Sequence, residues 1–378
     1  MSRFSAIAVL VSFLFLAPIV RGGHEMPIYP SFYPQEIRIE RVDPAHAANL
    51  LREAKIHAYL GDESRFPRDL PQSTAIESLG SFVVISVNPA SPLLKAATSC
   101  AIADTILHEL AVANSSGFVF HPYPVTPFHG DYLDQVDLAE AAKARIGGVQ
   151  QSNALHPKVE AAITLARHLV HTDRQMHEAR WDATIEEVSA AALVSSSTQV
   201  LNGWLGPPWL KEGWYQAYRL LGDALDNQDA KGRAEADLQG LETRDYDGSV
   251  ERINLERDLV STLTSGCNRV VAGYTVKRQY FNTDFSAGIE NIAFDSLAGF
   301  NTPMFLRTVK LKDFPWNGWL RLGVAQRAEA AWNPIGGFTD DVGHLLWFAL
   351  GDPAMIPAPY DTGWGVNRVS DVQSMPTR

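Results

Sequence analysis

The chain has 378 residues, of which 46% are hydrophobic and 20% are charged, an ordinary composition for a folded globular protein. It contains 32 Lys and Arg against 43 Asp and Glu, which gives a formal net charge of −11 at pH 7. A surface this acidic repels phosphate groups, and no basic run offsets it, so nucleic acid and anionic membrane surfaces are poor partners.

The first 22 residues have the features of a secretory signal peptide. Arg3 precedes an apolar run from 4 to 20, and the small residues Val20 and Gly22 precede a plausible cleavage point after Gly22. An uncleaved anchor is the alternative, because a run of about 17 apolar residues lies at the lower edge of what spans a bilayer. No later run is long enough, so we expect no membrane insertion after cleavage and a periplasmic or secreted protein.

Two cysteines, Cys100 and Cys267, fit this location in two ways. An even number of cysteines in an oxidising compartment suggests one disulfide bond, and two separate buried thiols are the alternative. Neither cysteine belongs to a CxxC motif, so the signatures of dithiol redox chemistry and of c-type haem attachment are absent.

The pattern of the first third predicts an α/β lobe over 23–135. Residues 36–42 alternate charge with isoleucine, which is typical of a strand, and Pro44 after Asp43 indicates the start of a helix. Further strands are predicted at 56–60, 81–87 and 117–120, and a helix at about 91–113. Strands that alternate with helices are typical of α/β domains with crossover connections.

The rest of the chain predicts a mainly helical segment over 136–240 and a mixed α+β lobe over 241–378. Alanine and leucine at helical spacing indicate helices at 137–145, 157–176 and 184–200, and 226–240 reads as a linker or a solvated helix. The last third is loop-rich, with strands expected at 269–281 and 304–311 and a helix near 341–350. The expected fold class is therefore α/β to α+β, in two lobes.

The strand and helix order between Ile37 and Val87 is similar in architecture to that of bacterial solute-binding proteins. This resemblance implies a two-lobed receptor that closes on a small molecule. Indole and phenol rings on loops give such a ligand a stacking surface. The aromatic residues expected to meet it share positions on loops or at strand ends, and they are Tyr59, Tyr123, Trp204, Trp209, Trp316 and Trp319. The alternative is that these rings pack in the core.

A proline-rich loop after the strand at 117–120 suggests a metal site. It carries His121, His129 and Asp131, and imidazoles on a pre-ordered loop can bind copper or zinc. His24, near the expected mature N-terminus, is a second candidate for copper. The alternative is that His121 and His129 are hydrogen-bonded structural residues.

Two functions follow from these patterns. The first is an exported soluble protein that binds a small organic ligand between two lobes. The alternative is a periplasmic copper- or zinc-binding metalloprotein, with redox or hydrolytic chemistry at an open coordination position. Known catalytic motifs are incomplete, since His108-Glu109 lacks the second histidine of HExxH, so the sequence does not decide whether the chain is an enzyme.

Overall fold

The computed structural model describes residues 34–61, 66–67, 70–112, 117–148, 155–161, 181–195, 197, 206–313, 318–329, 340–351, 355–358 and 363–366. The expected signal peptide lies outside this part. Its strands are β1 (Glu36–Arg41), β2 (Ala58–Tyr59), β3 (Ser73–Val87), β4 (Phe118–Phe120), β5 (Val159–Ala161), β6 (Ala183–Ser189), β7 (Arg269–Asn282), β8 (Ile289–Glu290), β9 (Lys310–Leu311), β10 (Trp319–Val324), β11 (Met355–Pro357) and β12 (Trp364–Val366). Its α-helices are α2 (Pro44–Arg52), α3 (Ser99–Val112), α4 (Val136–Gly148), α6 (Ala190–Ser195), α7 (Gly213–Leu221), α8 (Gln228–Thr243), α9 (Ser249–Thr264), α10 (Pro303–Thr308) and α11 (Asp341–Leu350). Short 3₁₀ turns are η1 (Pro92–Lys95), η2 (Tyr132–Gln135), η3 (Pro208–Lys211) and η4 (Gly222–Ala224).

One mixed eight-stranded sheet organises the molecule, with the order β1-β10-β2-β7-β3-β6-β5 and with β4 paired to β7. Strands β1, β10 and β2 run parallel, whereas β2, β3 and β4 all pair antiparallel with β7. The predicted fold class, α/β to α+β in two lobes, is confirmed. No helix in the described ranges is long and apolar enough to cross a membrane.

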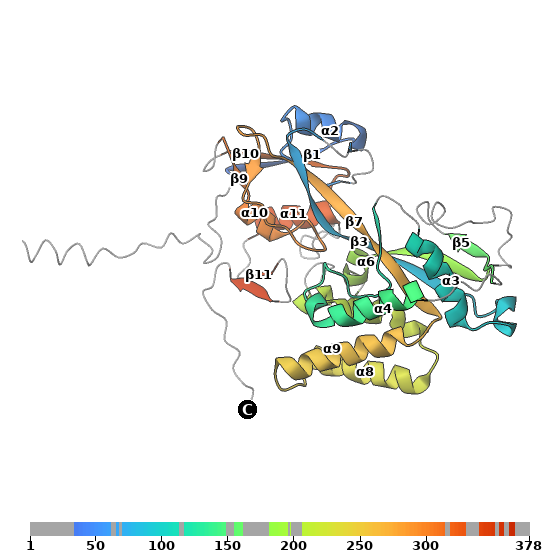
Figure 1. Ribbon diagram of the computed structural model, residues 1–378. Helices are drawn as coiled ribbons and strands as arrows, with labels where there is room; N and C mark the ends of the chain where they lie inside the picture. The colour runs from blue at the N-terminus through green and yellow to red at the C-terminus, as the bar shows by residue number, and fades with distance from the viewer. Residues whose placement is uncertain are drawn as a thin grey trace, which may run out of the picture.

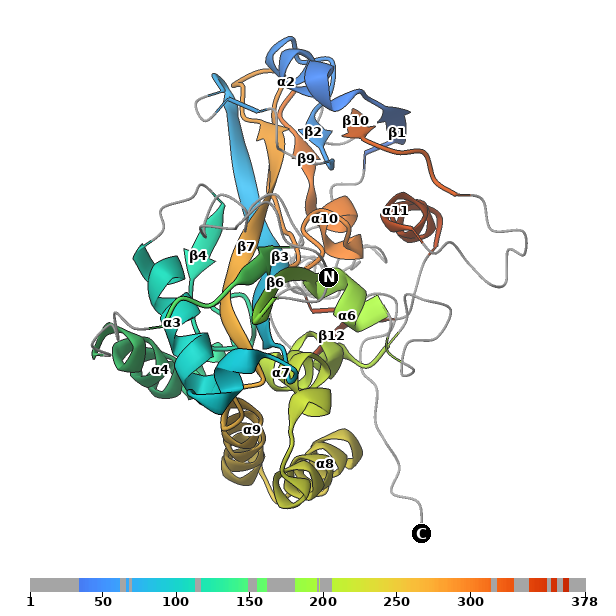
Figure 2. The same cartoon turned by 90° about the vertical axis from the view of Figure 1, so that its right-hand side faces the viewer.

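The long strands β3 and β7 run side by side from one lobe to the other (Figures 1 and 2). One of the two lobes, which we call the β1 lobe, contains β1, α2, β2, α10, β10 and α11. The second, the helical lobe, contains α3, α4, β4–β6 and α6–α9. Separate hydrophobic clusters fill the two lobes. The β1 lobe combines early and late segments, so its core joins residues from both sides of the expected boundaries at 135 and 240.

In the helical lobe, helices cover both faces of the sheet. Consecutive residues of a strand point to opposite faces. Phe82 and Val84 accordingly pack in the cluster formed with α7, α8 and α9, while Val83 and Ile85 pack in the cluster formed with α3. All four side chains are fully buried, which explains the continuous apolar run in this half of β3.

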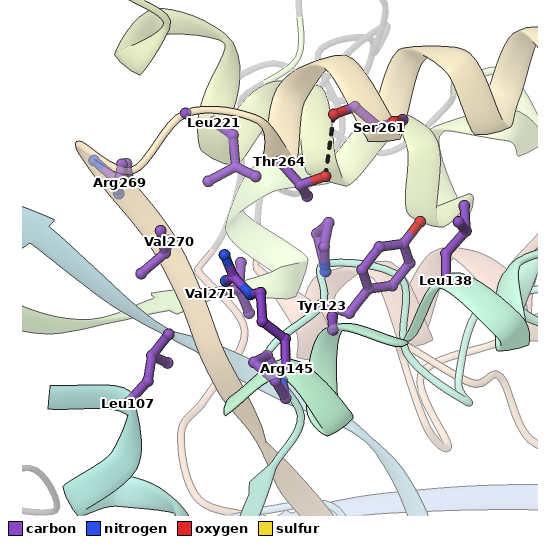
Figure 3. A pocket seen from close by; sticks show the side chains of 14 residues that line it. Leu107, Tyr123, Leu138, Arg145, Leu221, Ser261, Thr264, Arg269, Val270 and Val271 are labelled. Carbon is purple, nitrogen blue, oxygen red and sulfur yellow. Dashed lines mark hydrogen bonds between the residues drawn. The ribbon is translucent and has the colours of Figure 1, made fainter. Parts of the chain in front are cut away.

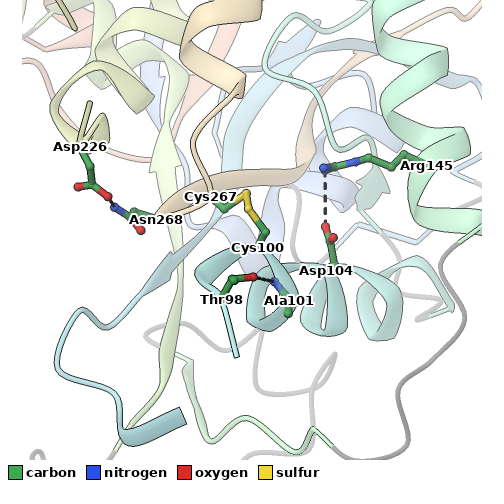
Figure 4. The surroundings of a disulfide bond; sticks show 8 residues. All are labelled: Thr98, Cys100, Ala101, Asp104, Arg145, Asp226, Cys267 and Asn268. Carbon is green, nitrogen blue, oxygen red and sulfur yellow. Dashed lines mark hydrogen bonds and ion pairs between the residues drawn. A yellow bond between two sulfur atoms is a disulfide. The ribbon is translucent and has the colours of Figure 1, made fainter. Parts of the chain in front are cut away.

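A disulfide bond between Cys100 and Cys267 ties α3 to the turn between α9 and β7 (Figure 4). The two Cα atoms are 4.8 Å apart and are separated by 167 positions in the sequence. Of the two alternatives for the cysteines, a disulfide bond or two separate buried thiols, the structure therefore contains the disulfide bond.

Three predicted elements are wrong in type. The expected helix at 157–176 contains strand β5 at Val159–Ala161, and its remainder from 162 onward lies outside the described residues. The expected helix at 184–200 begins as β6, because Ile185 pairs with Ile85 across the sheet and both are fully buried. The expected strand at 304–311 is mostly α10. Thr302 caps that helix by accepting a hydrogen bond from the Met304 amide, and Pro303 occupies its first turn. Of the two alternatives for 226–240, a linker or a solvated helix, the structure contains the helix, α8, at Gln228–Thr243.

Candidate functional site

A cavity of about 210 Å³ lies in the helical lobe, and its lining includes residues of both hydrophobic clusters of that lobe. Figure 3 shows its walls, which come from α3, the loop after β4, α4, the end of α7, the end of α9 and the start of β7. The apolar part of the lining consists of Leu107, Pro122, Pro124, Leu138, Ala142, Leu221, Val270 and Val271. The polar part consists of Tyr123, Arg145, Ser261, Thr264 and Arg269.

Local sequence explains why space remains at this point. Pro122 and Pro124 hold the loop after β4 in an extended course, because proline fixes its own φ and restricts the residue before it. At the opposite wall α9 ends at Thr264, and Gly266 contributes no side chain. The disulfide at Cys267 then fixes the start of β7 against α3. Short and rigid residues thus frame the cavity on two sides.

Two guanidinium groups give the cavity its charge. Arg145 extends from α4 toward the middle of the space, and its Nη2 lies 3.6 Å from the Asp104 carboxylate (Figures 3 and 4). Arg269 Nη2 lies 2.6 Å from the Glu186 carboxylate. The Nε of Arg269 is buried without a hydrogen-bond partner in the described structure.

Tyr123 connects the cavity wall to a buried polar network. Its hydroxyl donates to Gln135 Oε1 at 2.9 Å, and Gln135 Nε2 donates to Asp131 at 3.3 Å. Burial raises the pKa of the Tyr123 phenol, so this ring stays neutral at physiological pH. The predicted ligand residue Tyr123 therefore lines the cavity as an uncharged side chain.

The remaining predicted aromatic residues are not gathered at this cavity. Tyr59 is buried in the β1 lobe, where its ring stacks on Phe66 at a centroid distance of 5.4 Å. Trp319 is half exposed at the start of β10, with the Arg38 guanidinium 4.4 Å from its ring centroid. Trp209 packs near α7, and Trp204 and Trp316 lie outside the described residues. This cavity lies within the helical lobe and not between the two lobes. The ligand position predicted between the lobes stays a prediction.

The predicted metal ligands take part in structural hydrogen bonds instead. His121 Nε2 donates to the Val125 carbonyl at 2.8 Å. His129 Nδ1 accepts from the Thr126 amide at 2.9 Å, and its Nε2 lies 3.1 Å from Gln216 Oε1. Burial lowers the pKa of both histidines, so both imidazoles are neutral at pH 7.

Asp131 caps the start of helix α7. Its carboxylate accepts from the backbone amides of Gly213 at 2.9 Å and Trp214 at 3.0 Å, at the start of α7. The described part of the chain holds no group of three or more His, Cys, Asp or Glu side chains that could bind a metal ion. His121, His129 and Asp131 thus lie in a structural hydrogen-bond network, and the copper or zinc site at these residues stays a prediction, as does the one at His24, which lies outside the described residues.

Sequence reasoning missed the two arginines and the two hydroxyl residues of the cavity. Arg145, Ser261, Thr264 and Arg269 lie on three elements and belong to no motif. The available signal was the break at Gly266-Cys267-Asn268, which separates α9 from a long β-rich run.

No family model matches the chain, and no curated protein matches it in sequence. Solved structures with partial likeness include HbpA2 from Haemophilus parasuis, with 11% identity and a TM-score of 0.42 over 71% of this chain and 56% of that protein. The ABC transporter substrate-binding protein CtaP from Listeria monocytogenes has 10% identity and a TM-score of 0.41 over 70% of this chain and 58% of CtaP. The oligopeptide-binding protein AppA from Bacillus subtilis, in complex with a nonapeptide, has 12% identity and a TM-score of 0.37 over 71% and 58%. The chain thus spans less than three fifths of the length of each, and likenesses at this level establish neither ligand nor activity.

Proposed function

We propose that this chain is an exported binding protein for a small organic ligand that carries an acidic group. The observation that carries the proposal is the cavity beside Tyr123, which combines an aliphatic lining with two guanidinium groups and two hydroxyl residues. Ligand sites in proteins are typically concave and mostly apolar, with a few placed polar groups that fix orientation.

The charges of the cavity favour an anionic ligand. Each arginine already contacts one carboxylate at its outer side, yet Arg269 Nε still lacks an acceptor. A ligand carboxylate would supply that acceptor through a charge-assisted hydrogen bond. The volume of about 210 Å³ lies below the usual range of drug-sized pockets, which favours a compact organic acid.

The disulfide bond supports the location. Cys100–Cys267 is a bond of the kind that persists in oxidising compartments and is rare in the cytosol. Together with the expected signal peptide, it favours a periplasmic or secreted protein. The acidic surface accords with a small-molecule partner and not with a polyanionic one.

A ligand screen by thermal shift tests the proposal. The panel contains amino acids, small mono- and dicarboxylates, sugars and, because one compared protein holds a nonapeptide, short peptides. We expect a carboxylate to raise the melting temperature, and Arg269→Gln and Arg145→Gln each to weaken its binding by about tenfold, as for one charge-assisted hydrogen bond. Arg233→Gln, at an exposed position on α8, is the matched control and should bind normally.

A blocking variant separates binding in this cavity from binding elsewhere. Ala142→Phe adds a ring at the α4 wall and should abolish the thermal shift without unfolding the chain. The proposal fails if ligands bind Ala142→Phe as they bind the wild type. It also fails if no ligand shifts the wild type and mass spectrometry of the unfolded protein releases no small molecule.

A further inference from the structure

The sheet that joins the two lobes is irregular where it passes between them. Ile76 of β3 packs in a hydrophobic cluster of the β1 lobe, whereas Leu79 and Phe82 of the same strand pack in a cluster of the helical lobe. The register of β3 with β7 shifts between Leu79 and Phe82. A β-bulge bends its strand and interrupts the ladder, so we expect the lobes to bend relative to each other at this point.

A second segment, residues 291–300, leaves the β1 lobe, reaches the helical lobe and returns. Phe300 packs in the β1 lobe, whereas Leu297 at the tip of the segment packs in a cluster of the helical lobe. The tip is a compact turn, in which the amides of Asp295 and Gly299 each donate to the carbonyl of the other at 2.9 Å. Asp295 Oδ1 accepts from two further amides of the turn, so its Oδ2 can serve a partner outside it.

That partner is Lys211, at the end of η3 in the helical lobe. Its Nζ donates to Asp295 Oδ2 at 2.6 Å and to the Ala358 carbonyl at 2.8 Å. Ala358 follows β11, and Ile356 of that strand is fully buried in one cluster with Met304 of α10. The single ammonium group therefore ties the helical lobe to two separate segments that are anchored in the β1 lobe.

The contact between Lys211 and Asp295 is shielded from water. Their side chains are 18% and 6% exposed, whereas those of the ion pair between Lys55 and Glu53 in the β1 lobe are 65% and 49% exposed. Exposed pairs contribute little to stability. In a shielded pair the charged hydrogen bond is stronger, and removal of one partner leaves the other charge buried and unpaired.

We propose that Lys211 is a latch between the lobes. While its ammonium group holds Asp295 and the Ala358 carbonyl, segment 291–300 and β11 stay against the helical lobe. When these contacts break, the lobes change their relative orientation by bending at the irregular part of the β3–β7 ladder. The inference does not depend on the ligand of the cavity beside Tyr123.

The experiment measures the distance between the lobes of the full chain by double electron–electron resonance. Nitroxide labels are attached to His46→Cys on α2 and Glu235→Cys on α8, which are exposed positions on helices at opposite ends of the molecule (Figures 1 and 2). The two native cysteines do not take up the label, because they form the disulfide bond.

Two variants remove the latch from either side. Lys211→Met deletes the ammonium group and keeps the length of the side chain, whereas Asp295→Asn deletes the charge and keeps Oδ1 for the amides of the turn. We expect each to raise the population at a second interlobe distance by about tenfold, the effect of one hydrogen bond between charged groups on an equilibrium constant. Lys55→Met removes an exposed ion pair within the β1 lobe, and as the matched control it should keep the wild-type distances.

The double variant distinguishes a shared contact from two local effects. Because both changes remove the same interaction, Lys211→Met with Asp295→Asn should match Lys211→Met alone. The proposal is overturned if either folded single variant keeps the wild-type distances, or if the two effects add in the double variant. Should near-UV circular dichroism show that Lys211→Met does not fold, Asp295→Asn alone decides, and wild-type distances in that variant contradict the latch.

Discussion

Asp131 and Glu212 hold each other in place across 81 positions of the chain. Glu212 Oε2 accepts a hydrogen bond from the Asp131 amide, while the Asp131 carboxylate accepts from the two amides that directly follow Glu212. Both side chains are nearly inaccessible, at 2% and 4% exposure. This reciprocal contact fixes the loop after β4 to the start of α7, and through Gln135 it also supports Tyr123.

The first prediction concerns the pH dependence of stability at Glu212. Burial and the nearby Asp131 raise the pKa of Glu212 to about 9, whereas a glutamate in the unfolded chain has a pKa of about 4.3. The folded chain therefore keeps a proton that the unfolded chain loses, and stability falls as pH rises between about 5 and 9. Glu212→Gln mimics the protonated form and should melt several degrees higher than the wild type at pH 8, but not at pH 4. Equal melting curves for the two proteins at pH 8 would contradict this account, and Glu235→Gln serves as the control.

The second prediction concerns His57, which acts in the opposite direction. This histidine is buried under β10, its Nδ1 accepts from the Arg321 amide at 3.0 Å, and burial and Arg321 lower its pKa to about 4. In the unfolded chain the imidazole of His57 binds a proton near pH 6.5, whereas in the folded chain it stays neutral down to about pH 4. The free energy of unfolding therefore decreases as pH falls from about 6.5 to 4. Acid titration of the wild type, followed by near-UV circular dichroism, should show this loss. His57→Asn should flatten that part of the pH profile, whereas His46→Asn, on the exposed face of α2, should leave it unchanged.

The third prediction concerns the disulfide bond. It closes a loop of 167 positions, and the chain-entropy model assigns such a bond about 5 kcal/mol of stability. Denaturant unfolding of the Cys100→Ala, Cys267→Ala double variant should show a lower midpoint, and reductant should lower the wild type to the same value. Because Gly266 and Arg269 flank Cys267 in the cavity wall, the affinity for the ligand should fall as well. If reductant leaves the denaturation midpoint of the wild type unchanged, the disulfide bond does not stabilise the fold.

The fourth prediction compares two glycine positions. A Cβ on Gly273 in β7 would lie 2.2 Å from the Val119 carbonyl oxygen, whereas one on Gly232 in α8 would meet nothing within 4 Å. Gly273→Ala should therefore disrupt the β4–β7 pairing and cost about 1–3 kcal/mol, as an overpacked core does. Gly232→Ala should raise the free energy of unfolding by about 0.5–1 kcal/mol, because alanine is the better helix former. Chemical denaturation of both variants measures the difference, and a neutral Gly273→Ala would show that the strands separate easily.

Local sequence patterns predicted the central elements well and the site poorly. The β-rich runs at 81–87 and 269–281 form parts of β3 and β7, and residues 82–85 and 271–274 within them are buried on both faces of the sheet. The helix at 341–350 also formed as predicted. The cavity is formed by six segments that meet only through tertiary packing. The ion pairs of Arg145 with Asp104 and of Arg269 with Glu186 join residues whose positions in the sequence show no recognisable spacing, so they could not be predicted. The sequence of the histidine loop likewise gives no sign of its distant partners, since Gln216 bonds to His129 and the Gly213 amide to Asp131 from over 80 positions away.

The parallel pairing of β1 with β10 has a consequence for the order in which this chain can assemble. Glu36 lies opposite Trp319, so the edge of the sheet in the β1 lobe cannot form until more than 280 residues have emerged after its first strand. The helical lobe, whose elements all lie between β3 and β7, can close earlier. A chain exported from its N-terminus would therefore carry an unpaired edge strand through most of its passage, and it would depend on remaining unfolded or shielded until the last segments arrive.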